Sequence, residues 1–247
     1  MLILALDTSS SSGSVALVKG DTVVAERNSA QVGTHSEWLM PSIDAMMKDA
    51  GVSVSEIEKI ALSYGPGSFT GLRIGVSIAK GIAWTLGVKI IGVSTLKALA
   101  FNLAENDHSV EAGTIAVPLL DARRGEVYSA LYELGNEPPT ALIDDSALTI
   151  DALLDEIAER GLGEKALFLG DGLKVYAGRI LENMAPRQIA APELWRVNAA
   201  LVAKCAQMEI SEAGEFASVG SEPVDFTPFY LRKSEAEIRL KGPRKGF

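Results

Sequence analysis

The pattern of hydrophobic and polar positions occurs twice along the chain. Residues 2–27 contain three apolar runs with polar alternation, separated by a hydroxyl-rich turn after Asp7 and a second turn at Gly20. Residues 114–143 repeat this order, beginning with an apolar run that ends at Asp121 and a tight turn that contains glycine. Alternation bounded by turn residues predicts three consecutive antiparallel strands in each segment.

The elements that follow each set of strands also match. After the first set, the pattern predicts a helix at about 36–50, a strand at 59–64, a glycine loop and a second helix. After the second set, it predicts a helix at about 149–160, a strand at 165–170 and a helix at about 173–184. The sequence therefore predicts an α/β protein with two duplicated βββαβα units.

A polar, turn-rich stretch at residues 105–113 separates the two units. The first unit also contains an extra predicted strand at 88–94 and a helix from about Thr95. We divide the chain into an N-terminal subdomain, a C-terminal subdomain and a basic tail: 1–105, 106–231 and 232–247.

Composition narrows the class of protein. The 247 residues are 47% hydrophobic and 22% charged, as in ordinary globular proteins, and the net charge of −9 argues against a broad nucleic-acid surface. One cysteine, Cys205, excludes an internal disulfide and suits a reducing cytosol. The first residues read as a strand, without the features of a signal peptide, and no apolar run is long enough for a membrane span. We expect a cytoplasmic protein.

The segment YGPGSFTGLRIGVSIAKGIAW, residues 64–84, joins a glycine loop to an apolar helix. Gly65 and Gly71 do not have the spacing of a phosphate-binding P-loop, and no lysine follows Gly71. Small residues instead recur every four positions along the helix: Gly71, Gly75, Ala79 and Ala83. A helix that is apolar nearly all round must be covered on both sides. Either another part of the chain or a partner protein covers this small-residue stripe.

A twinned βββαβα unit with an aspartate at the end of each first strand resembles the actin-like ATPase superfamily (ASKHA, ribonuclease H-like fold). In that superfamily the two hairpin turns face each other across a cleft and bind nucleotide phosphates. The second turn here has Arg123 where close approach to a phosphate favours glycine. The cleft is either degenerate, with aspartates that cap turns, or a weak nucleotide site. Its expected residues are Asp7, Thr8, Ser9, Asp121, Arg123, Gly170 and Gly172.

Four further segments occur in a fixed order: HSEWLMP (35–41), GPGSFTGLRIG (65–75), LLDARRGEVY (119–128) and PFYLRKSEAE (228–237). Together they resemble the characteristic motifs of the TsaB (YeaZ) family of bacterial tRNA threonylcarbamoyladenosine biosynthesis proteins. The resemblance extends over the whole chain. It implies an actin-like fold without an independent catalytic site.

The resemblance also implies partners. Members of the family form a heterodimer with the longer catalytic paralogue TsaD and act with the ATPase TsaE on tRNA. This chain would need no cofactor, because ATP or ADP and the metal are expected in the partner subunits. An exposed apolar helix also predicts a homodimer when the chain is alone. The expected partner interface contains Gly71, Leu72, Arg73, Gly75, Val76, Ala79, Ile82, Ala83, His35 and Leu39.

No catalytic or metal-binding set is evident in the sequence. His35 has Leu39 four residues later instead of a second histidine, so one helix turn does not supply two metal ligands. Thr34 and Glu37 fit a capping box at a helix start, and Pro41 predicts a kink or a second helical segment. Cys205 reads as an inert core thiol. The rival hypothesis is a free-standing actin-like kinase or ATPase that uses Asp7 and Asp121.

The basic tail allows two interpretations. Residues 232–247 contain six Lys or Arg and two Glu, a net charge of +4. They could contact tRNA phosphates, or they could form a solvated C-terminus. The basic residues available for tRNA contact are Arg232, Lys233, Arg239, Lys241, Arg244 and Lys245.

Overall fold

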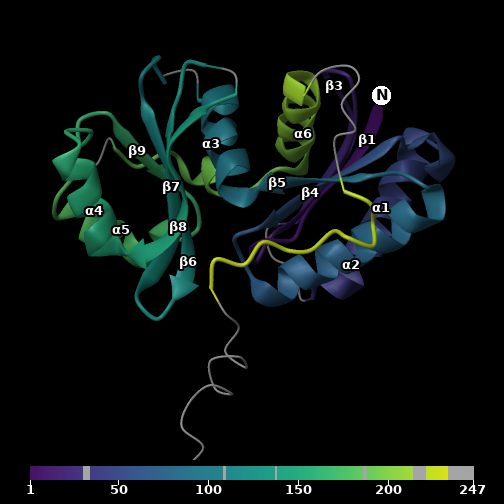
Figure 1. The fold of residues 1–247 in the computed structure, drawn as a ribbon, viewed down its shortest axis with the longest axis horizontal. Helices are drawn as coiled ribbons and strands as arrows, with labels where there is room; N and C mark the ends of the chain where they lie inside the picture. The colour runs from purple at the N-terminus through teal and green to yellow at the C-terminus, as the bar shows by residue number, and fades with distance from the viewer. Residues whose placement is uncertain (30–33, 108–109, 137, 186–187, 214–220, 233–247) are drawn as a thin grey trace, which may run out of the picture.

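Two mixed β-sheets form the framework of the protein in the computed structural model (Figure 1). The residues that the structure describes are 1–29, 34–107, 110–136, 138–185, 188–213 and 221–232. The first sheet has the order β3-β2-β1-β4-β5 and the second has the order β8-β7-β6-β9.

The strands of the first sheet are β1 (Leu2–Asp7), β2 (Gly13–Lys19), β3 (Thr22–Ser29), β4 (Lys59–Gly65) and β5 (Ile90–Ser94). Those of the second are β6 (Ile115–Arg123), β7 (Glu126–Glu133), β8 (Thr140–Thr149) and β9 (Ala166–Leu169). In each sheet, three antiparallel strands are followed by one that pairs in parallel with the first strand. The predicted duplication is confirmed, and this arrangement is the actin-like fold.

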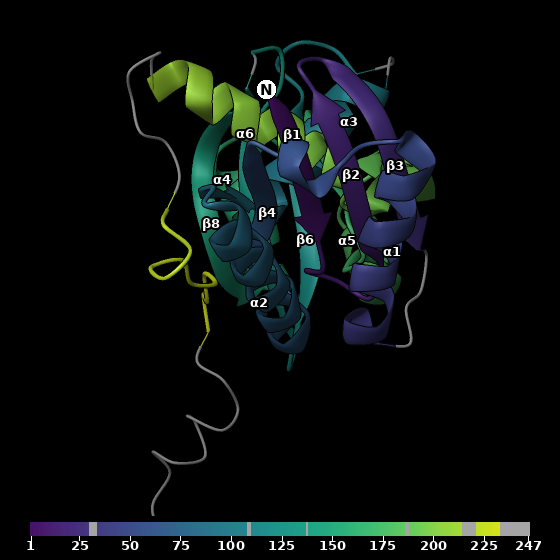
Figure 2. The same cartoon turned by 90° about the vertical axis from the view of Figure 1, so that its right-hand side faces the viewer.

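Two helices cover the outer face of each sheet. Helices α1 (His35–Ala50) and α2 (Phe69–Leu86) lie side by side on the first sheet (Figure 2), and α4 (Ile150–Glu159) and α5 (Leu173–Leu181) lie on the second. Each pair closes an apolar core over its sheet. We call each sheet with its two outer helices a lobe. In the described part of the chain, no helix is long and apolar enough to cross a bilayer.

The remaining helices, α3 (Thr95–Asn106) and α6 (Ala199–Ala213), lie between the two sheets (Figure 1). Helix α3 follows the first sheet but also packs on β6, β7 and β9 of the second. Helix α6 follows the second sheet but packs on β1, β2 and β4 of the first. The two helices share one core of buried side chains with both sheets. The structure therefore differs from the sequence-based division at residue 106, because α6 belongs with the N-terminal lobe.

The segment 221–232 is an extended strap. It starts beside β5, where Ser221 pairs with Ile90, and passes along α2 toward the second lobe (Figure 1). This segment packs largely on the first lobe, although the sequence-based division placed residues 221–231 in the C-terminal subdomain and Arg232 in the basic tail. The short helices η1 (Val54–Glu56) and η3 (Pro192–Trp195) complete the described elements.

The start of α1 agrees with the sequence in position but not in detail. Thr34 is the N-cap residue of α1, but its side chain makes no capping hydrogen bond. Pro41 lies inside one continuous helix. A capping box is present instead at η1, between Ser53 and Glu56.

Candidate functional site

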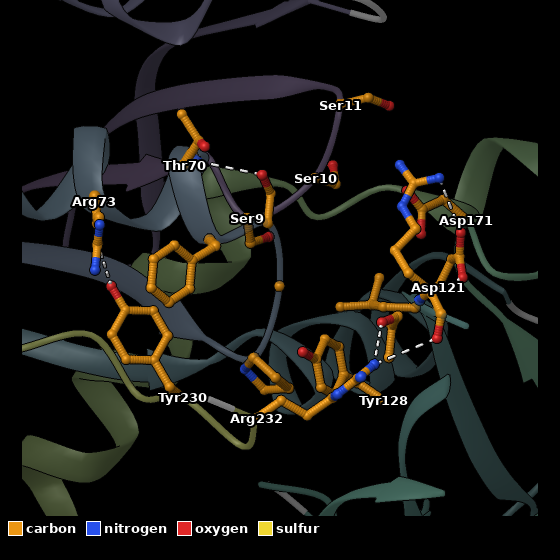
Figure 3. A pocket seen from close by; sticks show the side chains of 18 of the residues that line it. Ser9, Ser10, Ser11, Thr70, Arg73, Asp121, Tyr128, Asp171, Tyr230 and Arg232 are labelled. Carbon is orange, nitrogen blue, oxygen red and sulfur yellow. Dashed lines mark hydrogen bonds and ion pairs between the residues drawn. The ribbon is translucent and has the colours of Figure 1, made fainter. Parts of the chain in front are cut away.

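A cleft of about 1070 Å³ lies between the two lobes (Figure 3). Its first wall consists of the β1–β2 turn, the start of α1 and the loop at the start of α2, and its second wall consists of the β6–β7 turn and the start of α5. The end of the strap, Phe229 to Arg232, also lines the cleft. Hydroxyl groups dominate the first wall: Ser9, Ser10, Ser11, Thr34, Ser36, Ser68 and Thr70.

Asp7 ends β1 but does not line the cleft. Its side chain is fully buried, and its Oδ1 accepts hydrogen bonds from the backbone N–H of Ser9 at 3.3 Å and from the Ser9 hydroxyl at 2.6 Å. Oδ2 has no hydrogen-bond partner among the described residues. Burial raises the pKa of Asp7 to about 6, and the bonds from Ser9 oppose this rise. The carboxyl group thus caps a turn beneath the cleft surface.

His35, which was expected in a partner interface, lies in the first wall. Its Nε2 is 2.8 Å from the carbonyl oxygen of Ser10, and because that oxygen only accepts, Nε2 carries the proton. Nδ1 is buried, and the structure gives it no hydrogen-bond partner in the described ranges. The histidine therefore fixes the β1–β2 turn against the first residue of α1.

The glycines after β4 allow the β1–β2 turn to pack on the start of α2. A Cβ atom at Gly67 would clash with the carbonyl oxygen of Ser9, and one at Gly71 with the carbonyl oxygen of Thr8. The Thr8 hydroxyl donates a hydrogen bond to the carbonyl oxygen of Gly71 at 2.8 Å. The glycines of this loop thus permit close contact between two segments of one chain.

The small-residue stripe of α2 faces inward, so the expectation that it projects toward a partner was wrong. Leu72, Val76, Ala79 and Ala83 are at most 5% exposed, and Gly71 and Gly75 are buried with them. His35 and Leu39, at 9% and 0% exposure, are also buried. The stripe is covered because α2 packs on β4 and α1 within the core of the first lobe, and its first two glycines lie against Thr8 after β1. Of the expected interface residues, only Arg73 is exposed, and Ile82 is partly buried.

The second wall carries charged groups. Arg123 and Arg124 adopt positive φ angles of 66° and 58°, and the backbone N–H of Arg123 donates to Asp121 Oδ1 at 2.8 Å. Asp121 thus caps its turn as Asp7 does, which agrees with the turn-capping interpretation. The Arg123 guanidinium also pairs with Asp121 at 3.4 Å. Burial raises the pKa of Asp171, Lys174 lowers it, and the neighbouring Asp121 raises it further.

The expected cleft residues separate into two groups. Ser9, Asp121 and Arg123 line the cleft, whereas Asp7 and Thr8 are buried beneath it. Gly170 and Gly172 pack against the backbone of Leu119 and are not among the lining residues. Within the described ranges, no three His, Cys, Asp or Glu side chains gather closely enough to hold a metal ion.

The strap contributes side chains that the sequence did not place in the site. The rings of Phe69 and Tyr230 stack at 4.5 Å, and the Arg73 guanidinium lies 3.9 Å from the centre of the Phe69 ring (Figure 3). Arg73 also donates to the Tyr230 hydroxyl at 3.2 Å. Tyr230 belongs to the segment PFYLRKSEAE that the sequence analysis singled out, but no pattern in the sequence indicated that it would pack on α2.

Arg232 binds protein groups, which counts against its expected role in tRNA contact. Its guanidinium donates to the carbonyl oxygen of Ala122 at 2.7 Å and pairs with Glu126 at 3.0 Å. The other basic residues named for tRNA contact, Lys233, Arg239, Lys241, Arg244 and Lys245, lie outside the described residues.

The face of α2 opposite the stripe is open. Its exposed residues carry little charge: Thr70, Arg73, Ser77, Gly81, Trp84 and Thr85. Trp84 is 72% exposed, the largest exposed fraction among the large apolar residues of the described chain. We call this surface the α2 outer face.

Comparisons with known proteins identify the family. A model of the family described as "TsaD: tRNA N6-adenosine threonylcarbamoyltransferase" matches residues 23–240. The chain is 32% identical over 244 residues to the tRNA threonylcarbamoyladenosine biosynthesis protein TsaB of Bacillus subtilis, with 97% of each chain covered. It is 27% identical to the TsaB of Haemophilus influenzae over 98% of each chain.

Solved structures agree. YeaZ from Pseudomonas aeruginosa superimposes with a TM-score of 0.72 at 26% identity, covering 93% of this chain and 99% of that one. The motifs, the duplicated fold and these relatives agree, and the chain belongs to the TsaB (YeaZ) family.

Proposed function

We propose that the protein is a non-catalytic subunit of the complex that forms N6-threonylcarbamoyladenosine in tRNA. In this proposal it binds and stabilises the catalytic paralogue TsaD, and the ATPase TsaE joins them. The curated relatives named for this biosynthesis and the match to the TsaD family model support the assignment. Nucleotide and metal would be bound by the partner subunits, and tRNA would be reached through the complex.

One observation carries the proposal: on the side of α2 that faces away from its own sheet, the large apolar side chain of Trp84 is exposed among small and mostly uncharged residues, and the strap contacts this side only at Arg73 among the exposed residues of α2 in the described chain. Gly81 lies on this face with no atom within 4 Å of a Cβ built there. Trp84, one turn later, supplies a large exposed aromatic ring. Tryptophan is enriched among the residues that dominate the binding energy of protein interfaces, and exposed apolar surface of this kind marks interaction sites. We therefore move the proposed partner contact from the inward stripe to the α2 outer face.

The geometry favours this function over a free-standing kinase or ATPase. In the rival hypothesis, Asp7 would act on a bound nucleotide, but its carboxyl group is fully buried beneath Ser9. The second turn presents Arg123 and Asp121 paired with each other. Neither turn offers the paired, accessible carboxylates that the rival mechanism requires.

The test is co-purification with the TsaD paralogue after a bulky side chain is introduced on the α2 outer face. Gly81→Leu adds a side chain in open space, so it should abolish co-purification and leave the circular dichroism unchanged. Gly178→Leu is the matched control, because Gly178 lies within α5 and also has no atom near a Cβ. Retained co-purification of Gly81→Leu, or equal loss in both variants, would reject the α2 outer face as the contact.

The same variants test self-association. When the chain is alone, the α2 outer face should pair with a second copy, so size-exclusion chromatography should show a concentration-dependent dimer. Gly81→Leu should be monomeric. The purified chain should show no ATP turnover, whereas turnover lost in Asp7→Asn would favour the kinase or ATPase hypothesis.

A further inference from the structure

The strap joins both lobes through contacts at its two ends. In the part of the strap that lies on the first lobe, Phe226 is 5% exposed and belongs to the core under α1 and α2. The absence of a side chain at Gly92 leaves room for this ring, because a Cβ there would lie 3.1 Å from two Phe226 ring atoms. The backbone N–H of Phe229 donates to the carbonyl oxygen of Tyr64 at 2.8 Å. These contacts fix the strap to the first lobe.

The far end of the strap is fixed to the second lobe. Arg232 donates to the carbonyl oxygen of Ala122 and pairs with Glu126, which lie on either side of the β6–β7 turn. A partly exposed ion pair alone contributes little stability. A guanidinium that also binds a backbone carbonyl is held in a defined orientation, because its donors form a rigid fork. Arg232 therefore positions this turn relative to the strap.

Between these ends, Tyr230 holds the strap to α2. Its ring stacks on Phe69, and its hydroxyl accepts a hydrogen bond from Arg73. Phe69 and Arg73 lie in the first turns of α2, at the first wall of the cleft. A continuous series of contacts thus runs from α2 through Tyr230 and Arg232 to the turn that forms the second wall.

The position of the strap relative to α3 and α6 decides how strongly it restricts movement of the two lobes. Helices α3 and α6 join the lobes through a buried apolar core, and the strap crosses between the lobes below these helices in Figure 1. In hinge motion, two lobes rotate about the side where they are joined, and the cleft on the opposite side opens or closes. A link across the cleft restricts such motion more than another contact within the core.

We infer that residues 221–232 act as a clasp that sets the opening of the interlobe cleft, with Arg232 as its attachment to the second lobe. Loss of the Arg232 contacts should let the β6–β7 turn move away from the first wall. Since Arg73 lies on the α2 outer face, the clasp also links that surface to the second wall. The inference concerns this chain alone and does not depend on the proposed partner.

The experiment measures the distance between two spin labels across the cleft. Ser11→Cys and Val175→Cys place the labels on exposed residues of opposite walls. Native Cys205 should not be labelled, because it is fully buried and burial raises its pKa to about 12. In this background, Arg232→Ala should shift the distance distribution to longer values and broaden it, and Arg232→Lys should give a smaller shift.

Variants at the other contacts make the test independent of any one substitution. Tyr230→Ala removes the attachment to α2 and should give a shift similar to that of Arg232→Ala, whereas Tyr230→Phe keeps the ring and should give less. Arg179→Ala is the control, because Arg179 forms its ion pairs with Asp151 and Glu182 within the second lobe. The inference is overturned if Arg232→Ala and Tyr230→Ala keep the parent distribution, or if Arg179→Ala broadens it equally.

Discussion

Gly75 of α2 lies directly against Thr8 of the β1–β2 turn. A Cβ atom at position 75 would clash with Thr8 Oγ1 and would lie 3.3 Å from a methyl group of Leu62. The same Thr8 hydroxyl is bonded to the carbonyl oxygen of Gly71, one turn earlier in the helix. The turn and the helix are therefore held together at a separation that only glycine permits.

Gly75→Ala should destabilise the protein. Overpacking a close contact costs about 1–3 kcal/mol, which exceeds the gain of about 1 kcal/mol from replacing glycine inside a helix. Gly81→Ala is the matched control in the same helix, and its added methyl group enters open space, so it should raise the free energy of unfolding by up to about 1 kcal/mol. Urea unfolding followed by circular dichroism measures both. Stabilisation by Gly75→Ala would show that the contact is looser than described.

The contribution of Asp7 to the free energy of unfolding should fall as pH rises through the acid range. Its pKa is raised from 3.8 to about 6, so between these values the folded protein holds a proton that the unfolded chain has lost. The contribution of the protonated carboxyl group is fully present below about pH 4 and is lost as pH approaches 6, by an amount on the order of 3 kcal/mol.

Asp7→Asn tests this linkage, because the amide carries no charge at any pH in this range. The variant should be more stable than the parent at pH 7, and the difference should shrink between pH 6 and pH 4. Unfolding free energies measured at several pH values give the two curves. A constant difference from pH 4 to pH 7 would contradict the raised pKa of Asp7.

Local pattern was enough to predict the strands, the helices and the duplication. The apolar runs before Asp7 and Asp121, and the turns after them, depend on residues close in sequence. The turn-capping role of both aspartates also follows from a contact two residues away.

Contacts between distant segments were not predictable in this way. The spacing of Gly71, Gly75, Ala79 and Ala83 indicates close approach of some neighbour, but it does not say whether that neighbour is Thr8 or another protein. The sequence also did not show that α3 packs on the second sheet and α6 on the first. The hydrophobic effect is non-directional, so an apolar helix gains a similar free energy by packing on either sheet. The attachment of Arg232 to a turn 109–110 residues earlier required the three-dimensional structure.

Trp84 should report contact at the α2 outer face. Its exposure of 72% predicts that a water-soluble quencher such as acrylamide reaches it readily, whereas Trp38 and Trp195 are partly buried. Adding the TsaD paralogue should reduce this quenching and move the emission to shorter wavelengths, because the ring would lose contact with water. Trp84→Phe should abolish both changes. Changes that persist in Trp84→Phe would place the contact elsewhere.

The reactivity of Cys205 should report opening of the core that α3 and α6 share between the two sheets. The thiol is fully buried in α6 within the core shared with α3, so a thiol reagent should react with it only when this layer opens. Leu99→Ala in α3 removes a fully buried side chain from the same core and should cost about 2–5 kcal/mol. At about 1.4 kcal/mol per factor of ten, the labelling rate should rise by at least about 30-fold if labelling follows global opening.

Leu142→Ala, at a position 36% exposed on β8, is the control and should change the rate little. Fast labelling of the parent protein, or equal rates in Leu99→Ala and the parent, would show that Cys205 is reached by a local opening that does not disturb the α3–α6 core.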